Sequence, residues 1–211
     1  AAAAAAATAA LALLGSGCAG SGSGDSGQLH VVATTTQIGD WMREVGGSAV
    51  AVDQVLQPNT DPHEYEPRPS DVEAAAGAKL VFANGDELDH WIDQIVSDSG
   101  SDARVVDLGE HVPLRLPGES SGAEASRYDP HWWHDPRNAE AAVREIEQAL
   151  AAADPAHRAL FQRNAEAYLR RLRALDAGIA RCVGSVPRGE RKLVTDHDAF
   201  GYFARRYGIE V

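Results

Sequence analysis

Three short segments of the sequence each combine a histidine with acidic residues and a strand-end or turn context. They are Asn-Thr-Asp-Pro-His-Glu-Tyr-Glu-Pro at 59–67, Asp-Pro-His-Trp-Trp-His-Asp-Pro at 129–136 and Thr-Asp-His-Asp-Ala-Phe at 195–200. Imidazole nitrogens bind Zn²⁺ well, and a neighbouring carboxylate can hold the second ring nitrogen. Because the segments are far apart in sequence, only a folded scaffold could unite them. The pattern predicts a metal site built from three loops.

Each segment offers at least one ligand for such a site. The first contributes His63 and the third His197, whereas the second contains both His131 and His134, three residues apart. From the residues alone, either histidine of the second segment could be the ligand. The remaining histidines lack a comparable context and are expected to be ordinary surface residues: His30, His90, His111 and His157.

A three-histidine site with an open fourth position is also an arrangement that zinc hydrolases use. Glu64, next to His63, could then act as a general base. However, the sequence contains neither a His-Glu-x-x-His pair nor a Gly-x-Ser-x-Gly nucleophile turn. A hydrolase is therefore kept only as the alternative to a binding protein.

The first half of the chain alternates between strand and helix patterns. This order predicts an α/β domain with a largely parallel sheet. Ligands of such sheets bind beyond the carboxyl ends of the strands, so the polar loop at 57–69 is expected on the functional rim. The expected strands are 29–35, 50–56, 79–83 and 105–108, and the expected helices are 36–47, a short one opened by a capping box at 70–73, and 88–96.

The second half is expected to be mostly helical. A long loop at 109–130 precedes two helices, each opened by an Asp-Pro pair, at 135–153 and 155–183. The latter would extend for about 42 Å, which suits a spine that joins two lobes. A strand at 192–195, a helix at 199–207 and the start of a strand at 209–211 would follow. Residues 188–211 are too few for a lobe with its own core, so we expect a C-terminal truncation.

The N-terminal residues read as an export signal. Residues 1–17 are alanine-rich and uncharged, and Cys18 is followed by a Gly/Ser-rich stretch. This order resembles a bacterial lipoprotein signal, in which residues 1–17 are removed, Cys18 is lipidated and residues 18–28 form a flexible tether. The chain would then be anchored by lipid at the outer face of the membrane, or be periplasmic.

Composition excludes several classes of function. The 211 residues include 31 acidic and 19 basic side chains, for a net charge of −12, which argues against a nucleic-acid-binding surface. No apolar run approaches the ~20 residues of a membrane-spanning helix. Two cysteines, Cys18 and Cys182, cannot form a disulfide framework.

The three histidine segments together resemble motifs of the metal-binding solute-binding proteins (cluster A-I) of bacterial ABC importers for zinc and manganese. The first motif stands here at 59–67 and 69–71, the second at 129–136, and the third at 196–203 and 207–208. The resemblance extends over residues 29–211, and three motifs in the right order are highly specific.

The resemblance implies a ligand set and a fold. It implies that His63, His131 and His197 bind the metal and that His134 lies outside the site. It also implies a two-lobed, periplasmic-binding-protein-like α/β fold whose parallel sheets are joined by one long rigid helix. We therefore expect an N-terminal lobe at 29–154, a linking helix at 155–184 and the start of a second lobe, only partly present, at 188–211.

The same resemblance implies the choice of metal. Manganese-binding members usually carry Glu in place of the third His, so His197 indicates Zn²⁺, with Mn²⁺ less favoured, in agreement with ligand chemistry. Members often take a carboxylate fourth ligand from the second lobe. Many zinc members also have a His-rich acidic loop before the second motif, but residues 115–128 contain no His and are not expected to scavenge metal.

The predicted function is therefore extracytoplasmic capture of Zn²⁺ and its delivery to the membrane permease of an ABC importer. The chain is expected to act as a monomer, without enzymatic activity and without a nucleic-acid partner. A metal-binding surface adhesin is a second alternative, because that role is attributed to some proteins of this family.

Overall fold

The computed structural model describes residues 27–122 and 124–211. The expected signal segment, Cys18 and most of the expected tether lie outside the described residues.

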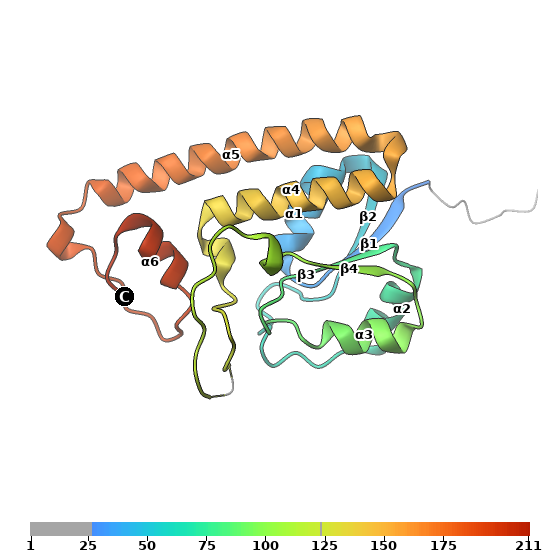
Figure 1. The fold of residues 1–211 in the computed structure, drawn as a ribbon, viewed down its shortest axis with the longest axis horizontal. Helices are drawn as coiled ribbons and strands as arrows, with labels where there is room; N and C mark the ends of the chain where they lie inside the picture. Colours follow the sequence, from blue (N-terminus) through green and yellow to red (C-terminus); the bar gives the residue numbers. More distant parts are fainter. Residues whose placement is uncertain (1–26, 123) are drawn as a thin grey trace, which may run out of the picture.

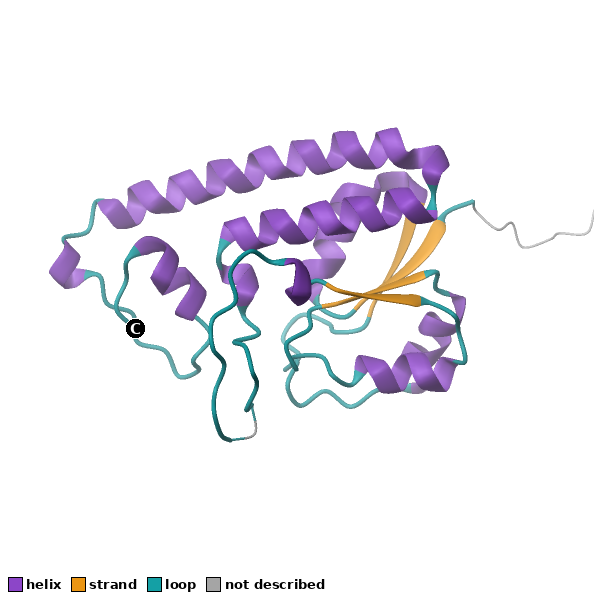
Figure 2. Ribbon diagram, viewed as in Figure 1, coloured by secondary structure: helices purple, strands orange, loops and turns teal. Residues whose placement is uncertain are grey.

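A parallel sheet forms the centre of the structure (Figure 2). Its strand order is β2-β1-β3-β4, and every neighbouring pair is parallel. The two central strands carry runs of apolar residues because helices cover both faces. The expected α/β architecture is thus confirmed. The strands are β1 (Leu29–Ala33), β2 (Val50–Gln54), β3 (Leu80–Ala83) and β4 (Arg104–Asp107).

Helices cover the sheet in two layers (Figure 1). Alternate residues of β1 separate the two cores: Val31 and Ala33 pack with one helix layer, whereas Val32 packs with the other. The first layer contains α1 (Thr36–Gly46), α4 (Pro136–Ala153) and α5 (Arg158–Gly184). The second contains α2 (Pro69–Gly77) and α3 (Ile92–Ser99).

Helix α5 is the expected long spine. Its first half buries one apolar stripe against α1 and α4, but beyond Leu172 none of its residues is buried. Helix α6 (Gly201–Tyr207) lies beneath this second half (Figure 1). Two side chains of α6 hold it there, because Arg206 and Tyr207 both contact the carboxylate of Asp176. The long helix therefore carries the C-terminal segment to the same side of the molecule as the strand ends.

Four helices begin elsewhere than expected, among them α6, which begins at Gly201 rather than residue 199. Helix α2 begins at Pro69, since proline suits the first helical position, and Asp71 rather than Glu73 accepts a backbone N–H from the capping residue Arg68. Helix α3 begins at Ile92 rather than residue 88, because the buried Asp89 carboxylate binds two backbone N–H groups and folds the preceding segment into turns. Residues 155–157 form a 3-10 turn, so α5 begins at Arg158.

The expected C-terminal strands do not form among the described residues. Residues 192–195 and 209–211 meet only through the parallel bridge between Lys192 and Glu210. A strand needs a ladder of hydrogen bonds to a neighbour, and neither segment has such a partner along its length in the described chain. Val194, in the first of these segments, is accordingly almost wholly exposed.

Short 3-10 turns connect the larger elements. They are η1 (Gly47–Ala49), η2 (Gly109–His111), η3 (Trp132–His134), η4 (Pro155–His157) and η5 (Arg188–Glu190).

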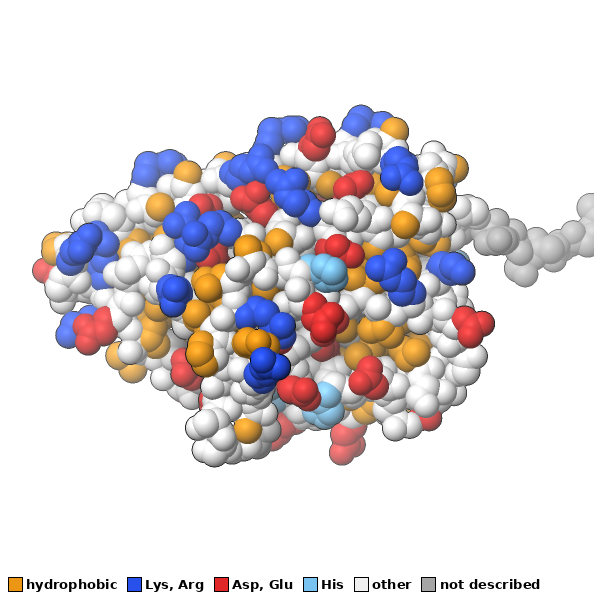
Figure 3. Space-filling view, in the orientation of Figure 1, with side chains coloured by type: hydrophobic (Ala, Val, Ile, Leu, Met, Phe, Trp, Pro, Cys, Tyr) orange, Lys and Arg blue, Asp and Glu red, His pale blue; other side chains and the backbone are white. Residues whose placement is uncertain are grey.

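In the described ranges, no helix combines the length and apolar character needed to cross a bilayer. Lys and Arg side chains gather along the edge formed by α5 in Figure 3, where some of them pair with acidic residues of neighbouring helices.

Candidate metal centre

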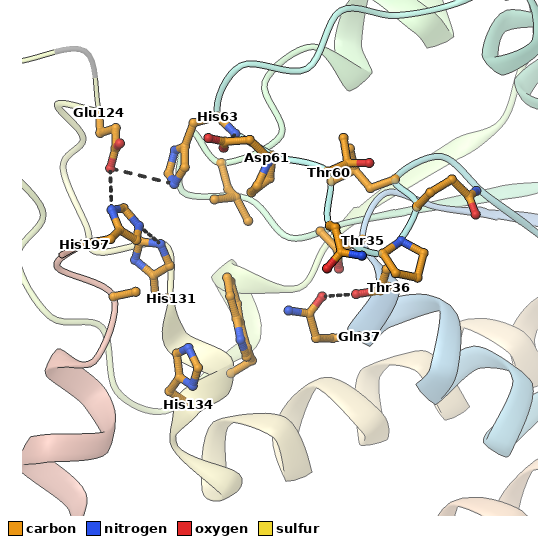
Figure 4. Close-up of a pocket in the computed structure, with 18 of the residues that line it drawn as sticks. Thr35, Thr36, Gln37, Thr60, Asp61, His63, Glu124, His131, His134 and His197 are labelled. Atoms are coloured by element: carbon orange, nitrogen blue, oxygen red, sulfur yellow. Dashed lines mark hydrogen bonds and ion pairs between the residues drawn. The ribbon is translucent and has the colours of Figure 1, made fainter. Parts of the chain in front are cut away.

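Three loops meet beside the carboxyl ends of the strands and bring His63, His131 and His197 together (Figure 4). His63 lies in the loop between β2 and α2, His131 comes directly before η3, and His197 comes before α6. Their candidate ligand nitrogens all lie within 4.8 Å of one another. The convergence that the motifs require is therefore present, and metal binding by these side chains stays a prediction.

The imidazoles face one another at short range. Nε2 of His197 lies 3.1 Å from Nε2 of His131, and the ring centroids of the three histidines are 5.0–5.6 Å apart. Ligand atoms 2.0–2.2 Å from a tetrahedral ion lie about 3.3–3.6 Å from each other. The spacing of the His131 and His197 nitrogens is therefore close to that of two zinc ligands, and the candidate nitrogen of His63 lies within 4.8 Å of both.

His131 is the most firmly held of the three. It is buried, and its Nδ1 lies 2.9 Å from Oδ1 of Asp129, which also accepts the backbone N–H of His131. A histidine whose Nδ1–H donates to a carboxylate presents Nε2 to a metal and becomes a more basic ligand. The next residue, Trp132, is fully buried and donates its indole N–H to the Asn84 carbonyl at the end of β3. His131 is thus tied directly to the sheet.

His63 is positioned by its own loop. Asp61 accepts the backbone N–H of His63, and the carbonyl of Pro62 accepts the indole N–H of Trp91. Partial burial lowers the pKa of His63, an effect only partly offset by Glu124, because removing the ring from water disfavours its charged form. Burial therefore favours the neutral form of His63, which is the form of an imidazole that can bind metal.

His197 is the most exposed ligand candidate. Its segment is fixed by Tyr202, whose buried hydroxyl donates to the Asp129 carbonyl and accepts the backbone N–H of Leu116. This one phenol connects α6 with the loop that carries His131. Tyr202 lies within the third motif at 196–203, but its sequence context alone did not indicate this anchoring role.

The histidines line one end of a cavity of about 500 Å³. His134 also lines this cavity, but it packs against Phe200 and is not part of the cluster; in Figure 4 it lies apart from the other three. Burial lowers the pKa of His134 to about 4, so it stays neutral at pH 7. The structure thus favours His131 over His134 by geometry.

One acidic side chain at the site, Glu124, was not among the residues expected from the sequence. Oε2 of Glu124 lies 3.8 Å from Nε2 of His63 and 3.6 Å from Nδ1 of His197. Glu124 belongs to the loop at 115–128, which contains no histidine and for that reason was not expected to scavenge metal. No motif marks this glutamate, and only the folding of the loop places it near the histidines.

The structure places Glu64 away from a catalytic position. The side chain is exposed and is not among the residues that line the cavity, although His63, its neighbour, is. A general base must reach the proton that it removes, directly or through one water. The geometry gives the hydrolase alternative no support.

Comparisons with known proteins give a consistent result. Residues 31–211 match the family described as ZnuA, zinc-uptake complex component A, periplasmic. The iron-binding protein YfeA of Yersinia pestis is 32% identical over 85% of this chain and 57% of the relative. The manganese-binding lipoprotein MntA of Bacillus subtilis is 33% identical over 87% of this chain and 60% of the relative.

The fold is shared with solved structures. The periplasmic zinc-binding protein TroA of Treponema pallidum superimposes with a TM-score of 0.79 at 33% identity, over 87% of this chain and 65% of that one. The chain spans about three fifths of the length of the curated relatives that it matches. The relatives are named for three different metals, iron, manganese and zinc.

Proposed function

The chain belongs to the ZnuA family of periplasmic metal-uptake components, and from this premise we propose that it captures Zn²⁺ outside the cytoplasm. The family consists of metal-binding solute-binding proteins of ABC transporters and not of enzymes. The observation that supports the proposal is the convergence of His63, His131 and His197 on one point at the strand ends.

The donor set favours zinc. Three imidazole nitrogens suit Zn²⁺, whereas Mn²⁺ is better served by carboxylate, carbonyl and water oxygens. The ion would bind Nε2 of His131, whose Nδ1 is held by Asp129, and one nitrogen each of His63 and His197. Some relatives are named for iron or manganese, so the choice of Zn²⁺ over these two ions is the part of the proposal that most needs a test.

Delivery to a membrane permease completes the proposed function. Relatives such as MntA are named as lipoproteins, and Cys18 followed by a Gly/Ser-rich stretch is the residue that would carry the lipid here. An anchored binding protein stays close to its permease, which raises the local concentration of the loaded form. We propose that residues 29–154 form the lobe that contains two ligands, and that the helix ending at 184 leads to the segment with the third.

The decisive experiment is a competition titration with a chromogenic chelator. Zn²⁺, Mn²⁺ and Fe²⁺ would each be titrated into the full chain and into His63→Ala, His131→Ala and His197→Ala. His30→Ala is the matched control, because His30 is an exposed histidine on β1, outside the cluster. We expect one tight site for Zn²⁺ that each of the three variants weakens by more than about tenfold, while the control binds as the unmodified chain does.

Two results would contradict the proposal. Tighter binding of Mn²⁺ or Fe²⁺ than of Zn²⁺ would overturn the metal assignment while leaving the site in place. Binding that is unchanged in all three variants, with folding verified by circular dichroism, would overturn the site itself.

A further inference from the structure

Glu124 faces two histidines of the cluster at distances that suit an ion pair but exceed a hydrogen bond. Its Oε2 faces two histidines at 3.8 and 3.6 Å, both longer than a hydrogen bond. Nε2 of His63 is buried and has no hydrogen-bond partner within the part of the chain that the structure describes. A carboxylate and a buried, unpaired imidazole nitrogen therefore face each other across a gap.

The width of this gap matches the distance between two ligands of one ion. Ligand atoms around tetrahedral zinc are separated by about 3.3–3.6 Å, and the 3.8 Å between His63 and Glu124 is close to that value. Figure 4 shows Glu124 pointing toward His63 and His197, with dashed lines to both. The carboxylate therefore lies where a fourth ligand would complete the three imidazoles.

The loop holds Glu124 in this position through its own pairing. On either side of Glu124 the chain folds back on itself: Glu119 accepts the backbone N–H of Ser126, and Pro117 pairs with Tyr128. The Arg115 guanidinium stacks on the Tyr128 ring, 3.8 Å from its centroid, and pairs with Asp86. These contacts fix the base of the loop that carries Glu124 to the turn after β3.

Charge gives a second reason for a carboxylate here. Three neutral imidazoles leave both positive charges of a divalent cation uncompensated, and a partly buried charge is costly unless it is paired. Asp129 lies behind His131 and does not face the cluster, whereas Glu124 is only about one third exposed and faces it directly. Glu124 can supply the direct neutralisation that imidazoles cannot.

We propose that Glu124 is a ligand of the bound metal ion, so that the part of the chain before the long helix contributes a carboxylate in addition to His63 and His131. This inference rests on the proposed function, because it concerns the same site. It assigns a ligand role to the loop at 115–128, which contains no histidine. Glu124 would then be the fourth protein ligand beside His63, His131 and His197.

The test compares Glu124→Gln with Glu119→Gln in the full chain. Glutamine keeps an oxygen that can accept a hydrogen bond from His197, but it lacks the negative charge of a good ligand. Glu119 lies in the same loop, is exposed and does not belong to the cluster, so it controls for general loss of acidity. Zn²⁺ affinity would be measured by chelator competition, and the coordination sphere by the visible absorption of bound Co²⁺.

We expect Glu124→Gln to weaken Zn²⁺ binding by about tenfold or more and to change the Co²⁺ spectrum, while Glu119→Gln changes neither. Glu124→Asp, which keeps the charge on a shorter side chain, should bind better than Glu124→Gln. An unchanged affinity and an unchanged Co²⁺ spectrum in Glu124→Gln would overturn the ligand role, because a hydrogen-bonding role alone survives that substitution. If His63→Ala, His131→Ala and His197→Ala also bind Zn²⁺ as tightly as the unmodified chain, the proposed function fails together with this inference.

Discussion

At the residue scale, the candidate site depends on how each imidazole is held and kept neutral. Asp129 holds the Nδ1 of His131, so Nε2 is left for the cluster. Burial lowers the pKa of His63, so its ring stays in the binding form under neutral conditions. Orientation and protonation of these imidazoles are thus both set by the fold, which would reduce the free energy lost on binding the proposed ion.

The first prediction concerns the carboxylate behind His131. We expect Asp129→Asn to weaken Zn²⁺ binding by about tenfold, because an amide makes His131 a less basic ligand than a carboxylate does. Chelator competition measures the effect. Asp154→Asn is the matched control, since Asp154 forms the same kind of pair with His157 at a site outside the cluster. Equal affinities in the two variants would contradict the role given to Asp129.

The second prediction concerns pH. Protons compete with metal for each imidazole, so Zn²⁺ affinity should fall as the pH decreases below the ordinary histidine value of 6.5. Because the pKa of His63 lies below that value, its protonation should contribute only at the acidic end of the curve. Titrations between about pH 5 and pH 8, corrected for the protonation of the chelator, measure the curve. Affinity independent of pH in this range would argue against imidazole ligation.

At the element scale, the carboxyl ends of the strands form the rim on which the site is built. The chain leaves β3 through a turn in which Asp86 and Glu87 take positive φ angles and Asp89 binds two backbone N–H groups. Asp107, at the end of β4, lies near the same turn. This rim therefore contains several carboxylates that are partly or fully removed from water, and their charge affects the stability of the sheet edge.

The third prediction follows from Asp107. Burial, reinforced by Asp86 and Asp89, raises the pKa of Asp107 from 3.8 to about 6. The folded state therefore binds a proton that the unfolded state releases, and stability decreases as the pH rises from 3.8 through 6. Asp107→Asn removes the charge and should stabilise the fold by roughly 1–2 kcal/mol above pH 6, but not near pH 4.

Urea unfolding of this variant near pH 4.5 and near pH 8 measures the difference. Asn can still accept the backbone N–H of Glu110, which Asp107 accepts in the native protein. Asp53→Asn on β2 removes an exposed charge from the same sheet and serves as the control. An equal change in stability at both pH values would contradict the assignment of the pKa shift to Asp107.

At the scale of the whole molecule, the site joins parts of the chain that the long helix separates. His63 and His131 belong to loops of the sheet domain, whereas His197 lies beyond α5. Helix α5 packs along the sheet domain, and α6 returns the chain to the strand ends. The buried hydroxyl of Tyr202 then connects α6 with the loop of His131. The three histidines can therefore come together only when α6 is packed correctly against the sheet domain.

The fourth prediction tests this docking. Tyr202→Phe leaves the Leu116 N–H and the Asp129 carbonyl without their buried partner, which should lower stability by about 1–3 kcal/mol. Zn²⁺ affinity should fall as well, because His131 and His197 lose their common anchor. Thermal unfolding with and without Zn²⁺ measures both effects.

Tyr168→Phe provides the comparison for this experiment. It removes a hydroxyl of α5 that contacts Asp40 at the surface, outside the cluster. We expect Tyr168→Phe to change Zn²⁺ affinity little. A Tyr202→Phe variant with lowered stability but undiminished Zn²⁺ affinity would show that the hydroxyl supports only the fold.

Much of this architecture could be predicted from the sequence because its signals are local. The apolar runs at 79–83 and the Asp-Pro pair at 135–136 act through neighbours in the chain, and the strand, the helix start and the parallel sheet are confirmed. His63 and His197 could be selected for the same reason, since each lies in a recognisable short segment, whereas the choice of His131 over His134 came from the family resemblance. The helix starts at 69 and 92 differed because a proline and a buried carboxylate, respectively, outweighed the expected cap, and the start at 158 differed because residues 155–157 form a 3-10 turn.

Other features were decided only by the tertiary structure. The segment at 192–195 has a strand-like sequence but finds no ladder among the described residues, because pairing depends on a neighbour and not on propensity. Glu124 and Tyr202 reach the site through contacts with residues far away in the chain, and no local pattern records such contacts. The sequence by itself thus determined which imidazoles could bind a metal. The folded chain decided which carboxylate faces them and which hydroxyl holds them together, because distances between remote side chains exist only after packing.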